Sequence, residues 1–263
     1  MDLNLNQKIA LVTGSTAGIG HAIATSLARE GATVIVNGRS RSAVDAVVAA
    51  MRAQTASTVH GFAGDLTQAA QAEALLREHP TVDILVNNLG IFEVCAFADI
   101  TDADWQRFFD ANVLSGARLA RMYFPQMLAR NWGRIIFISS ESGYQIPAEM
   151  IHYGMTKAAQ IAISRGLAET TVGTGVTVNT VLPGPTRSRG VGDFVAEMAR
   201  AAGKSPEAIE ADFFKTARPT SLLQRFGTPE EVASLVTYVA SSLSSATNGA
   251  ALRVDGGVIK SAY

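Results

Sequence analysis

The sequence contains very little cysteine, which excludes one class of protein at once. Cys95 is the single cysteine among 263 residues, so an intrachain disulfide cannot form. The four histidines lie too far apart to show the short spacings of a local zinc site. They are His21, His60, His79 and His152. The sequence therefore predicts neither a disulfide scaffold nor a local metal site.

Excess charge and long apolar runs are also lacking. Lysine and arginine number 22 against 23 aspartates and glutamates, which leaves a formal net charge of −1. A nearly neutral chain lacks the basic surface that nucleic-acid backbones require. No apolar run approaches the roughly 18 residues of a membrane span, and residues 1–8 lack the order of a signal peptide. We therefore expect a soluble, cytoplasmic protein with no nucleic-acid or membrane partner.

Apolar residues are abundant, at 48% of the chain, and 23 glycines accompany them. Seven short apolar runs alternate with segments of helical periodicity. The expected strands span residues 8–13, 33–37, 58–63, 83–86, 134–139, 176–181 and 250–254. This alternation predicts a single α/β domain over residues 1–263, a doubly wound Rossmann-type domain whose parallel strands are flanked by helices.

One stretch interrupts the alternation. Between Pro183 and Gly227 the sequence predicts no strand and two short helices, near residues 191–202 and 206–217. Long excursions at the carboxyl end of parallel strands commonly cover ligands, so we interpret about residues 184–227 as a substrate lid. Its apolar and cationic residues suit an apolar pocket with a cationic rim, although packing between helices explains most of the apolar positions. They are Val191, Phe194, Val195, Met198, Phe213 and Phe214, and Arg187, Arg189, Lys204, Lys215 and Arg218.

The first expected strand runs into a glycine-rich turn and then a helix. Gly14 permits a tight turn, Gly18 lets the backbone approach a pyrophosphate, and Gly20 lets the helix pack close to the sheet. The N–H groups at the start of the helix attract the anion. An ordinary helix-entry loop is the alternative, whereas a P-loop is excluded because no Lys-Ser/Thr pair follows. The expected dinucleotide-binding residues of this turn are Gly14, Ser15, Thr16, Gly18, Ile19 and Gly20.

The end of the second expected strand decides between the two nicotinamide dinucleotides. An acidic residue about 20 positions after the glycines would hold a ribose 2′-hydroxyl. The chain instead has Asn37-Gly38-Arg39-Ser40 there, and no carboxylate precedes Asp45. Arg39 is a planar cation suited to a 2′-phosphate, so we expect NADP (as NADPH) to be preferred, with NAD possible. An arginine that stacks on adenine without discriminating is the alternative.

Tyr153 and Lys157 lie four residues apart in a segment of helical periodicity, so their side chains share one helix face. A nearby ammonium lowers the pKa of a phenol, which makes Tyr153 an acid–base group near neutral pH. Ser140 ends the fifth expected strand, thirteen residues before the tyrosine. A hydroxyl at that position would hydrogen-bond the same substrate oxygen.

Together, these residues resemble the short-chain dehydrogenase/reductase family over essentially the whole chain. The residues that match the glycine motif are Thr13, Gly14, Gly18 and Gly20, and the adenine-ring aspartate is matched by Asp65 in Gly64-Asp65-Leu66. Asn87-Asn88-Leu89-Gly90 and Pro183-Gly184-Pro185-Thr186 match two further family segments. The active-site residues are matched by Asn112, Ser140, Tyr153 and Lys157. One departure is Leu89, which stands where the family usually has alanine.

The resemblance implies an NADP-dependent ketoreductase that transfers a hydride between the nicotinamide and a ketone or secondary alcohol. In that scheme Ser140 polarises the carbonyl oxygen and Tyr153 is the general acid and base, while Lys157 binds the ribose and, with Asn112, relays protons through a water. The implied cofactor contacts are Asp65, Leu66, Asn88, Gly90, Tyr153, Lys157, Pro183, Gly184 and Thr186. Asp65 can alternatively cap the following helix.

Two other activities and an assembly follow from the same resemblance. A reductase of 3-oxoacyl thioesters on acyl carrier protein shares every one of these motifs, and a non-catalytic NADP-binding regulator is the less favoured alternative. The helix expected over residues 153–170 is small or apolar nearly all round, which indicates a helix-to-helix contact between copies of the chain. The family usually implies a homotetramer, so a dimer or tetramer is expected, with burial inside the monomer as the alternative.

Overall fold

Residues 2–262 are described by a computed structural model, which gives no side-chain description at positions 189, 190, 193, 194, 197 and 198. Arg189, Phe194 and Met198 of the expected lid therefore have side chains outside the described residues.

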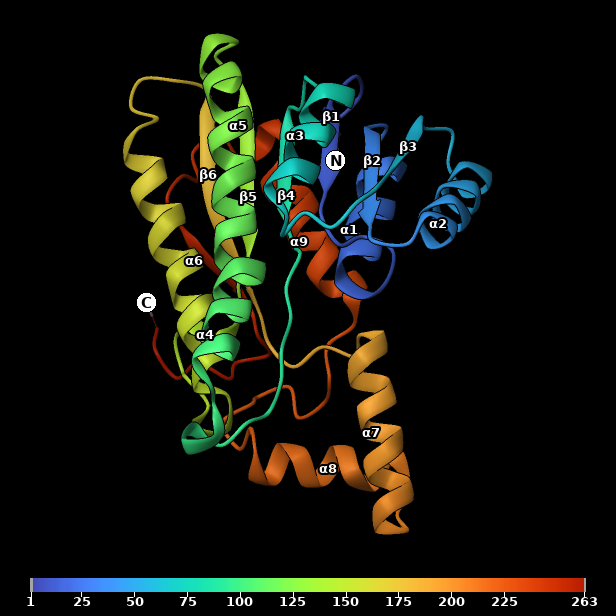
Figure 1. Ribbon diagram of the computed structural model, residues 1–263, viewed down its shortest axis with the longest axis vertical. Coiled ribbons are helices and arrows are strands. Elements are labelled where there is room, and N and C mark those ends of the chain that lie inside the picture. Colours follow the sequence, from blue (N-terminus) through green and yellow to red (C-terminus); the bar gives the residue numbers. More distant parts are fainter. Residues whose placement is uncertain (1, 263) are drawn as a thin grey trace.

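Seven parallel strands in the described chain form one sheet, in the order β3-β2-β1-β4-β5-β6-β7 (Figure 1). They are β1 (Ile9–Val12), β2 (Thr33–Gly38), β3 (Val59–Ala63), β4 (Ile84–Asn87), β5 (Gly133–Ile138), β6 (Val176–Pro183) and β7 (Ala251–Val254). The helices are α1 (Gly18–Arg29), α2 (Arg41–Gln54), α3 (Ala69–Glu78), α4 (Asp102–Phe109), α5 (Ser115–Ala129), α6 (Ile151–Glu169), α7 (Arg189–Ala202), α8 (Pro206–Thr216) and α9 (Pro229–Ala240). The predicted strands and the predicted doubly wound α/β fold are confirmed.

Helices cover both faces of this sheet. Successive strand residues point to opposite faces, so Val12 belongs to the core under α1, α2 and α9, whereas Leu11 belongs to the core under α3, α5 and α6. Burial on both faces explains why the strands read as continuous apolar runs. No helix within residues 2–262 is long and apolar enough to cross a lipid bilayer.

The strand order reverses between β1 and β4, which pair side by side while β2 lies on the other side of β1. At such a reversal the connecting loops diverge, and they leave a crevice at the carboxyl ends of the strands. This is the lower edge of the sheet in Figure 1, where α7 and α8 also lie. The fold therefore places the glycine turn after β1 and the segment after β4 on one side of the sheet.

The excursion after β6 contains two helices, α7 and α8, close to the positions that the sequence predicts. A bridge between Thr186 and Gly227 closes its base, and there the N–H of Arg187 donates to the Gly227 carbonyl at 2.8 Å. The helices pack around a small apolar cluster of their own, separate from the two cores of the sheet. Its buried residues are Val195, Ala199, Ile209, Phe214 and Phe226. This segment is thus attached through a narrow base and has an independent core.

Candidate active site

The turn between β1 and α1 has the backbone expected of an anion-binding loop. Gly14 and Gly18 have φ angles of +60° and +56°, in the left-handed region that favours glycine. No side chain caps the start of α1, and its first turn contains no acidic residue. The first backbone N–H groups of α1 therefore have no capping side chain, and the positive end of the helix dipole is uncompensated. This arrangement suits a pyrophosphate.

Two asparagines from neighbouring strands hold the turn in place. The N–H of Gly14 donates to Asn37 Oδ1 at 3.1 Å, and Asn88 Nδ2 donates to the carbonyls of Thr13 and Gly14 at 2.9 and 3.0 Å. Ser15 is fully buried, and its hydroxyl donates to the Val12 carbonyl while its N–H donates to the Asn37 carbonyl. Ser15 thus joins β1 to β2, and both of its donors are used within the protein.

A cleft of 580 Å³ runs along this edge of the sheet. The predicted cofactor residues that line it are Gly14, Thr16, Arg39, Asp65, Asn88 and Gly90. Glycine is needed at position 38 because a Cβ there would lie 2.5 Å from Thr16 Cγ2. The donor set and the shape of the cleft fit a dinucleotide, with the uncapped end of α1 available to the pyrophosphate.

The far end of the cleft contains Arg39 and Asp65. Arg39 is exposed and makes none of the hydrogen bonds or ion pairs found among residues 2–262, so its guanidinium is available to a ligand. Asp65 Oδ1 accepts from the N–H and hydroxyl of Thr67 at 3.1 and 2.8 Å. The alternative that Asp65 caps the next helix is wrong, because α3 begins after Gln68. The Leu66 side chain is buried in the core, which leaves only its backbone for a ligand.

The end of β5 and the start of α6 are packed directly together. Ser139 Oγ donates to the Lys157 carbonyl at 2.7 Å. A Cβ added to Gly143 would lie 2.8 Å from the Lys157 carbonyl carbon, so only glycine lets this turn approach the helix so closely. As a result Ser140, which is 7% exposed, lies close enough to the Tyr153 side chain to influence the pKa of the phenol.

Burial governs the ionisation of Tyr153. Loss of hydration raises the pKa of this phenol above its usual range, and the negative charge of Glu141 raises it further. The positive charge of Arg218 acts in the opposite direction, as does the neighbouring Ser140 hydroxyl when it donates to the phenol oxygen. The pKa of Tyr153 is therefore raised, not lowered as the sequence predicts. At neutral pH the group is a protonated phenol, ready to donate.

The Lys157 ammonium is buried beneath the cleft. Its Nζ donates to the Ile138 carbonyl at 2.9 Å and to Gln160 Oε1 at 3.4 Å, and it lies 5.5 Å from the centre of the Tyr153 ring. Burial lowers the pKa of Lys157 to about 7. A Cβ on Gly90 would lie 3.5 Å from this Nζ, so Gly90 separates the lysine from the cleft by backbone alone.

Asn112 lies in a single π-helical turn, residues 110–114, between α4 and α5. Such turns often mark functional sites. Its side chain exchanges two hydrogen bonds with the backbone of Ile91, at 2.7 and 3.0 Å, and donates to Thr156 Oγ1 at 2.9 Å. Its carbonyl accepts from Gln160 Nε2 at 2.5 Å. Gln160 therefore connects the Asn112 backbone carbonyl to Lys157 through two hydrogen bonds. The water that the resemblance implies at Asn112 stays a prediction.

The predicted residues after β6 lie at the same edge of the sheet. The N–H of Gly184 donates to the Val254 carbonyl at 3.1 Å, and a Cβ on Gly184 would lie 2.4 Å from the Asp255 carbonyl oxygen. Thr186 Oγ1 donates back to the Gly184 carbonyl at 2.9 Å. Pro183 is the last residue of β6, and Gly184 and Thr186 line a smaller hollow of 210 Å³ at the base of the α7–α8 excursion.

Two residues beside this site, Glu141 and Gln160, are not singled out by the sequence, and a third, Arg218, is named there only as a cationic residue of the lid. Glu141 and Arg218 form an ion pair next to Ser140, and Gln160 joins Lys157 to Asn112. The only local sequence signal for Glu141 is its position directly after Ser140. The only signal for Gln160 is a polar amide in a helix of mostly small residues. No local pattern pairs Arg218 with this site, because 77 positions separate it from Glu141.

Comparisons with known proteins place the chain among oxidoreductases. A family model described as short chain dehydrogenase matches residues 8–199. The uncharacterized oxidoreductase YvrD of Bacillus subtilis is 50% identical over 99% of this chain and all of its own. The 3-oxoacyl-[acyl-carrier-protein] reductase FabG of Aquifex aeolicus is 33% identical over 98% of this chain and all of its own. Among solved structures, L-sorbose reductase from Gluconobacter frateurii, complexed with NADPH and L-sorbose, superposes with a TM-score of 0.93 at 28% identity, over 99% of this chain and all of its own.

Burial of Lys157 should make the cofactor-free protein less stable. The folded pKa of about 7 lies below the usual 10.5, so the cost is complete below about pH 7 and disappears as the pH rises toward 10.5. Lys157→Met removes the charge at similar side-chain length. We expect it to raise the melting temperature at pH 6 by about 3 °C or more, with a gain that shrinks between pH 7 and pH 10. Circular dichroism measures the transition, and a Met variant that melts below the wild type at pH 6 would contradict the assignment.

Proposed function

This chain belongs to the short chain dehydrogenase family, and from that premise we propose that it is an NADP-dependent oxidoreductase acting on a ketone or secondary alcohol, with Tyr153 as the general acid and base. The observation that carries the proposal is the meeting of Ser140, Tyr153 and Lys157 beside a dinucleotide-sized cleft. Tyr153 and Ser140 can both reach one oxygen, while Gly90 separates Lys157 from the cleft. A protonated phenol next to a hydride donor is what carbonyl reduction requires.

The residues of the chain supply binding and proton transfer. When bound, the dihydronicotinamide supplies the hydride. Tyr153 donates its proton to the oxygen that becomes the alcohol, and Ser140 lies beside the same oxygen. Lys157 replaces that proton, and its hydrogen bonds to the Ile138 carbonyl and to Gln160 Oε1 hold the ammonium beside the Tyr153 ring. Alcohol oxidation runs through the same groups in the opposite sense.

Arg39 supports the preference for NADP. Its guanidinium lines the cleft where β2 ends, and no carboxylate lies at that strand end to receive a 2′-hydroxyl. A charge-assisted, two-pronged contact with a phosphate suits an arginine without an ionic partner. The remaining predicted contacts, at Ile19, Gly20, Leu66 and Pro183, would come from backbone groups or from apolar packing.

The surroundings of the site favour a carbonyl substrate with an apolar body. Exposed apolar side chains follow β4 and β5 at the edge where the site lies, and they include Phe92, Val94, Tyr144 and Ile146. Ile146 packs against α6 at Gly154, next to Tyr153. We propose that residues 184–227 cover this substrate as a lid. Reduction of a 3-oxoacyl thioester is the second candidate, favoured by the likeness to the acyl-carrier-protein reductase.

We also propose that the chain forms a homo-oligomer through α6 and the neighbouring α5. The exposed residues of α6 are the small Ala162 and Gly166 and the ion-paired Arg165 and Glu169, and a Cβ on Gly166 would meet no described atom within 4 Å. The small side chains at Ala162 and Gly166 would let a second copy approach the helix closely beside the Arg165–Glu169 pair.

Tyr153→Phe tests the acid–base assignment. The variant keeps the ring but loses the proton, so kcat for ketone reduction should fall about a thousandfold, while NADPH affinity changes little. Steady-state assays over a panel of ketones and acetoacetyl thioesters measure the first quantity, and NADPH fluorescence titration measures the second. Retention of more than a tenth of the wild-type kcat would refute the assignment. Faster turnover of the thioesters than of any free ketone would favour the second candidate function.

Arg39→Asp tests the cofactor preference. Loss of the guanidinium, together with a carboxylate that repels the 2′-phosphate, should lower the ratio of kcat/KM for NADPH over NADH by about tenfold to a hundredfold. Arg41→Asp is the matched control, because Arg41 is a surface residue whose nearest carboxylate is Asp45, at 4.0 Å on the same helix. A wild-type protein that uses NADH as well as NADPH would contradict the preference without touching the proton chemistry.

Gly166→Arg tests the oligomer. The arginine side chain has room in a single copy but would project into a neighbouring copy. We therefore expect a wild-type mass of two or four times 27.7 kDa and a smaller mass for the variant. Sedimentation velocity measures the masses. Gly192→Arg in α7 is the control, since that glycine also has no atom within 4 Å of an added Cβ. A monomeric wild type would overturn this proposal.

A further inference from the structure

A buried carboxylate lies directly beside the catalytic serine. Glu141 follows Ser140 in the chain, and its side chain is 4% exposed. One carboxylate oxygen, Oε2, accepts from Ser140 Oγ at 2.5 Å and from Ser142 Oγ at 2.7 Å. The other, Oε1, accepts from Arg218 Nε at 2.8 Å. Both oxygens therefore have donors, as a buried ionised carboxylate requires.

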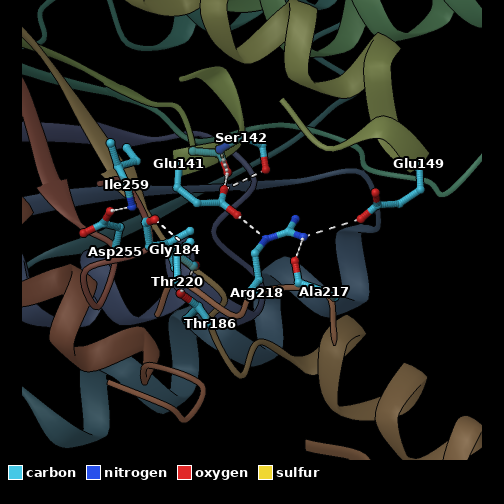
Figure 2. Close-up of polar contacts among 12 residues, drawn as sticks. Glu141, Ser142, Glu149, Gly184, Thr186, Ala217, Arg218, Thr220, Asp255 and Ile259 are labelled. Carbon is cyan, nitrogen blue, oxygen red and sulfur yellow. Dashed lines mark hydrogen bonds and ion pairs between the residues drawn. The ribbon is translucent and has the colours of Figure 1, made fainter. Parts of the chain in front are cut away.

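Arg218 comes from the segment that follows α8, far from Glu141 in sequence. Figure 2 shows its guanidinium between Glu141 and Glu149, and it donates to the Glu149 carboxylate at 3.4 Å. The Arg218 side chain is 12% exposed, whereas that of Glu149 is 46% exposed. The contact with Glu141 is therefore the buried one, where a charge pair is screened least and where removing one partner leaves an uncompensated charge.

The hydrogen bonds of Ser140 fix the position of its single proton. An ionised carboxylate can only accept, so in the contact with Glu141 the serine hydroxyl is the donor. The Ser140 oxygen in turn accepts from the N–H of Ser142 at 3.1 Å. A serine hydroxyl that donated to Tyr153 would lower the pKa of that phenol. Because the Ser140 proton points to Glu141 instead, it does not stabilise a Tyr153 phenolate, and Tyr153 keeps its own proton.

We propose that Glu141 and Arg218 are positioning residues that set the proton donor of this site: the carboxylate of Glu141, held by Arg218, accepts the hydrogen bond of the Ser140 hydroxyl, and Tyr153 thereby remains the group that donates to the substrate oxygen. This inference depends on the proposed function, since it assigns the direction of the hydrogen bonds within that same site. It biases the site toward carbonyl reduction. It also links the site to the excursion after β6, because Arg218 lies two residues after the end of α8.

The charges around Tyr153 determine in which direction each substitution should shift the pKa of this phenol. Glu141 from the turn after β5 raises the pKa of Tyr153, and Arg218 from the segment after α8 lowers it. Lys157 lies on the same helix, with Nζ 5.5 Å from the ring centre, and Glu149 acts only through Arg218. Removing the charge of Glu141 should therefore lower the pKa of Tyr153. Removing the charge of Arg218 should raise it, because Glu141 is then unpaired.

The test is the pH profile of kcat/KM for alcohol oxidation, whose acidic limb reports deprotonation of Tyr153. Glu141→Gln keeps the shape and lets the amide donate to Ser140, so we expect the limb to move down by about one pH unit. Arg218→Gln should move it up by about one unit, and Arg218→Lys should restore most of the wild-type position. Glu149→Gln is the matched control, with a shift smaller than half of that for Glu141→Gln, because Glu149 is half exposed.

Shifts of the acidic limb in opposite directions in Glu141→Gln and Arg218→Gln distinguish a positioning role from a purely structural one. A purely structural role would lower the rates without shifting the limb. The proposal is overturned if the acidic limb of the pH profile stays at its wild-type position in either folded variant, or if it moves in the same direction in both. If one variant fails to fold, the other variant decides by whether its limb moves in the direction expected for it. Ultraviolet titration of the Tyr153 phenolate, taken as the difference from Tyr153→Phe, gives a readout that needs no turnover. A wild type without oxidoreductase activity would refute the proposed function, while this titration would still test the placement of the proton.

Discussion

The close packing of the turn after β5 against the start of α6 is the contact on which the site depends. Ser139 donates to the Lys157 carbonyl, and Gly143 leaves no room for a side chain between turn and helix. This packing brings Ser140 to Tyr153 and removes water from both the phenol and the Lys157 ammonium. Desolvation then has opposite effects on the two groups, since it favours the neutral form of each. A neutral phenol is a proton donor, and a lysine with a pKa of about 7 can gain or lose a proton near neutral pH.

The proposed cofactor-binding residues and the proposed catalytic residues lie on different parts of the sheet. The glycine turn, Asn37 and Asn88 lie at β1, β2 and β4, where the strand order reverses. Ser140, Tyr153 and Lys157 lie at β5 and α6. Gly90 and the π-helical turn around Asn112 join the two halves, because Gly90 approaches Lys157 and the Asn112 side chain holds the backbone of Ile91. The segment after β6, with Arg218, closes the opposite side.

Most of the fold is readable from the sequence because each strand is a short apolar run buried on two faces. The tyrosine and lysine are readable too, since four residues of helix place them on one face. Features that depend on three-dimensional packing cannot be read from the sequence. The raised pKa of Tyr153 depends on how completely the phenol is desolvated and on Glu141, and spacing alone predicts the wrong direction. The pairing of Glu141 with Arg218 joins residues 77 positions apart, and no local pattern announces it.

A crystal structure of the protein with NADP bound tests the central claim most directly. We expect the nicotinamide to lie beside the Tyr153 hydroxyl, with that hydroxyl still within hydrogen-bonding distance of Ser140 and with Lys157 beneath the ribose. We also expect the 2′-phosphate at Arg39. A Tyr153 hydroxyl turned away from the nicotinamide, or separated from both Ser140 and Lys157, would contradict the proposed role of this site in hydride transfer.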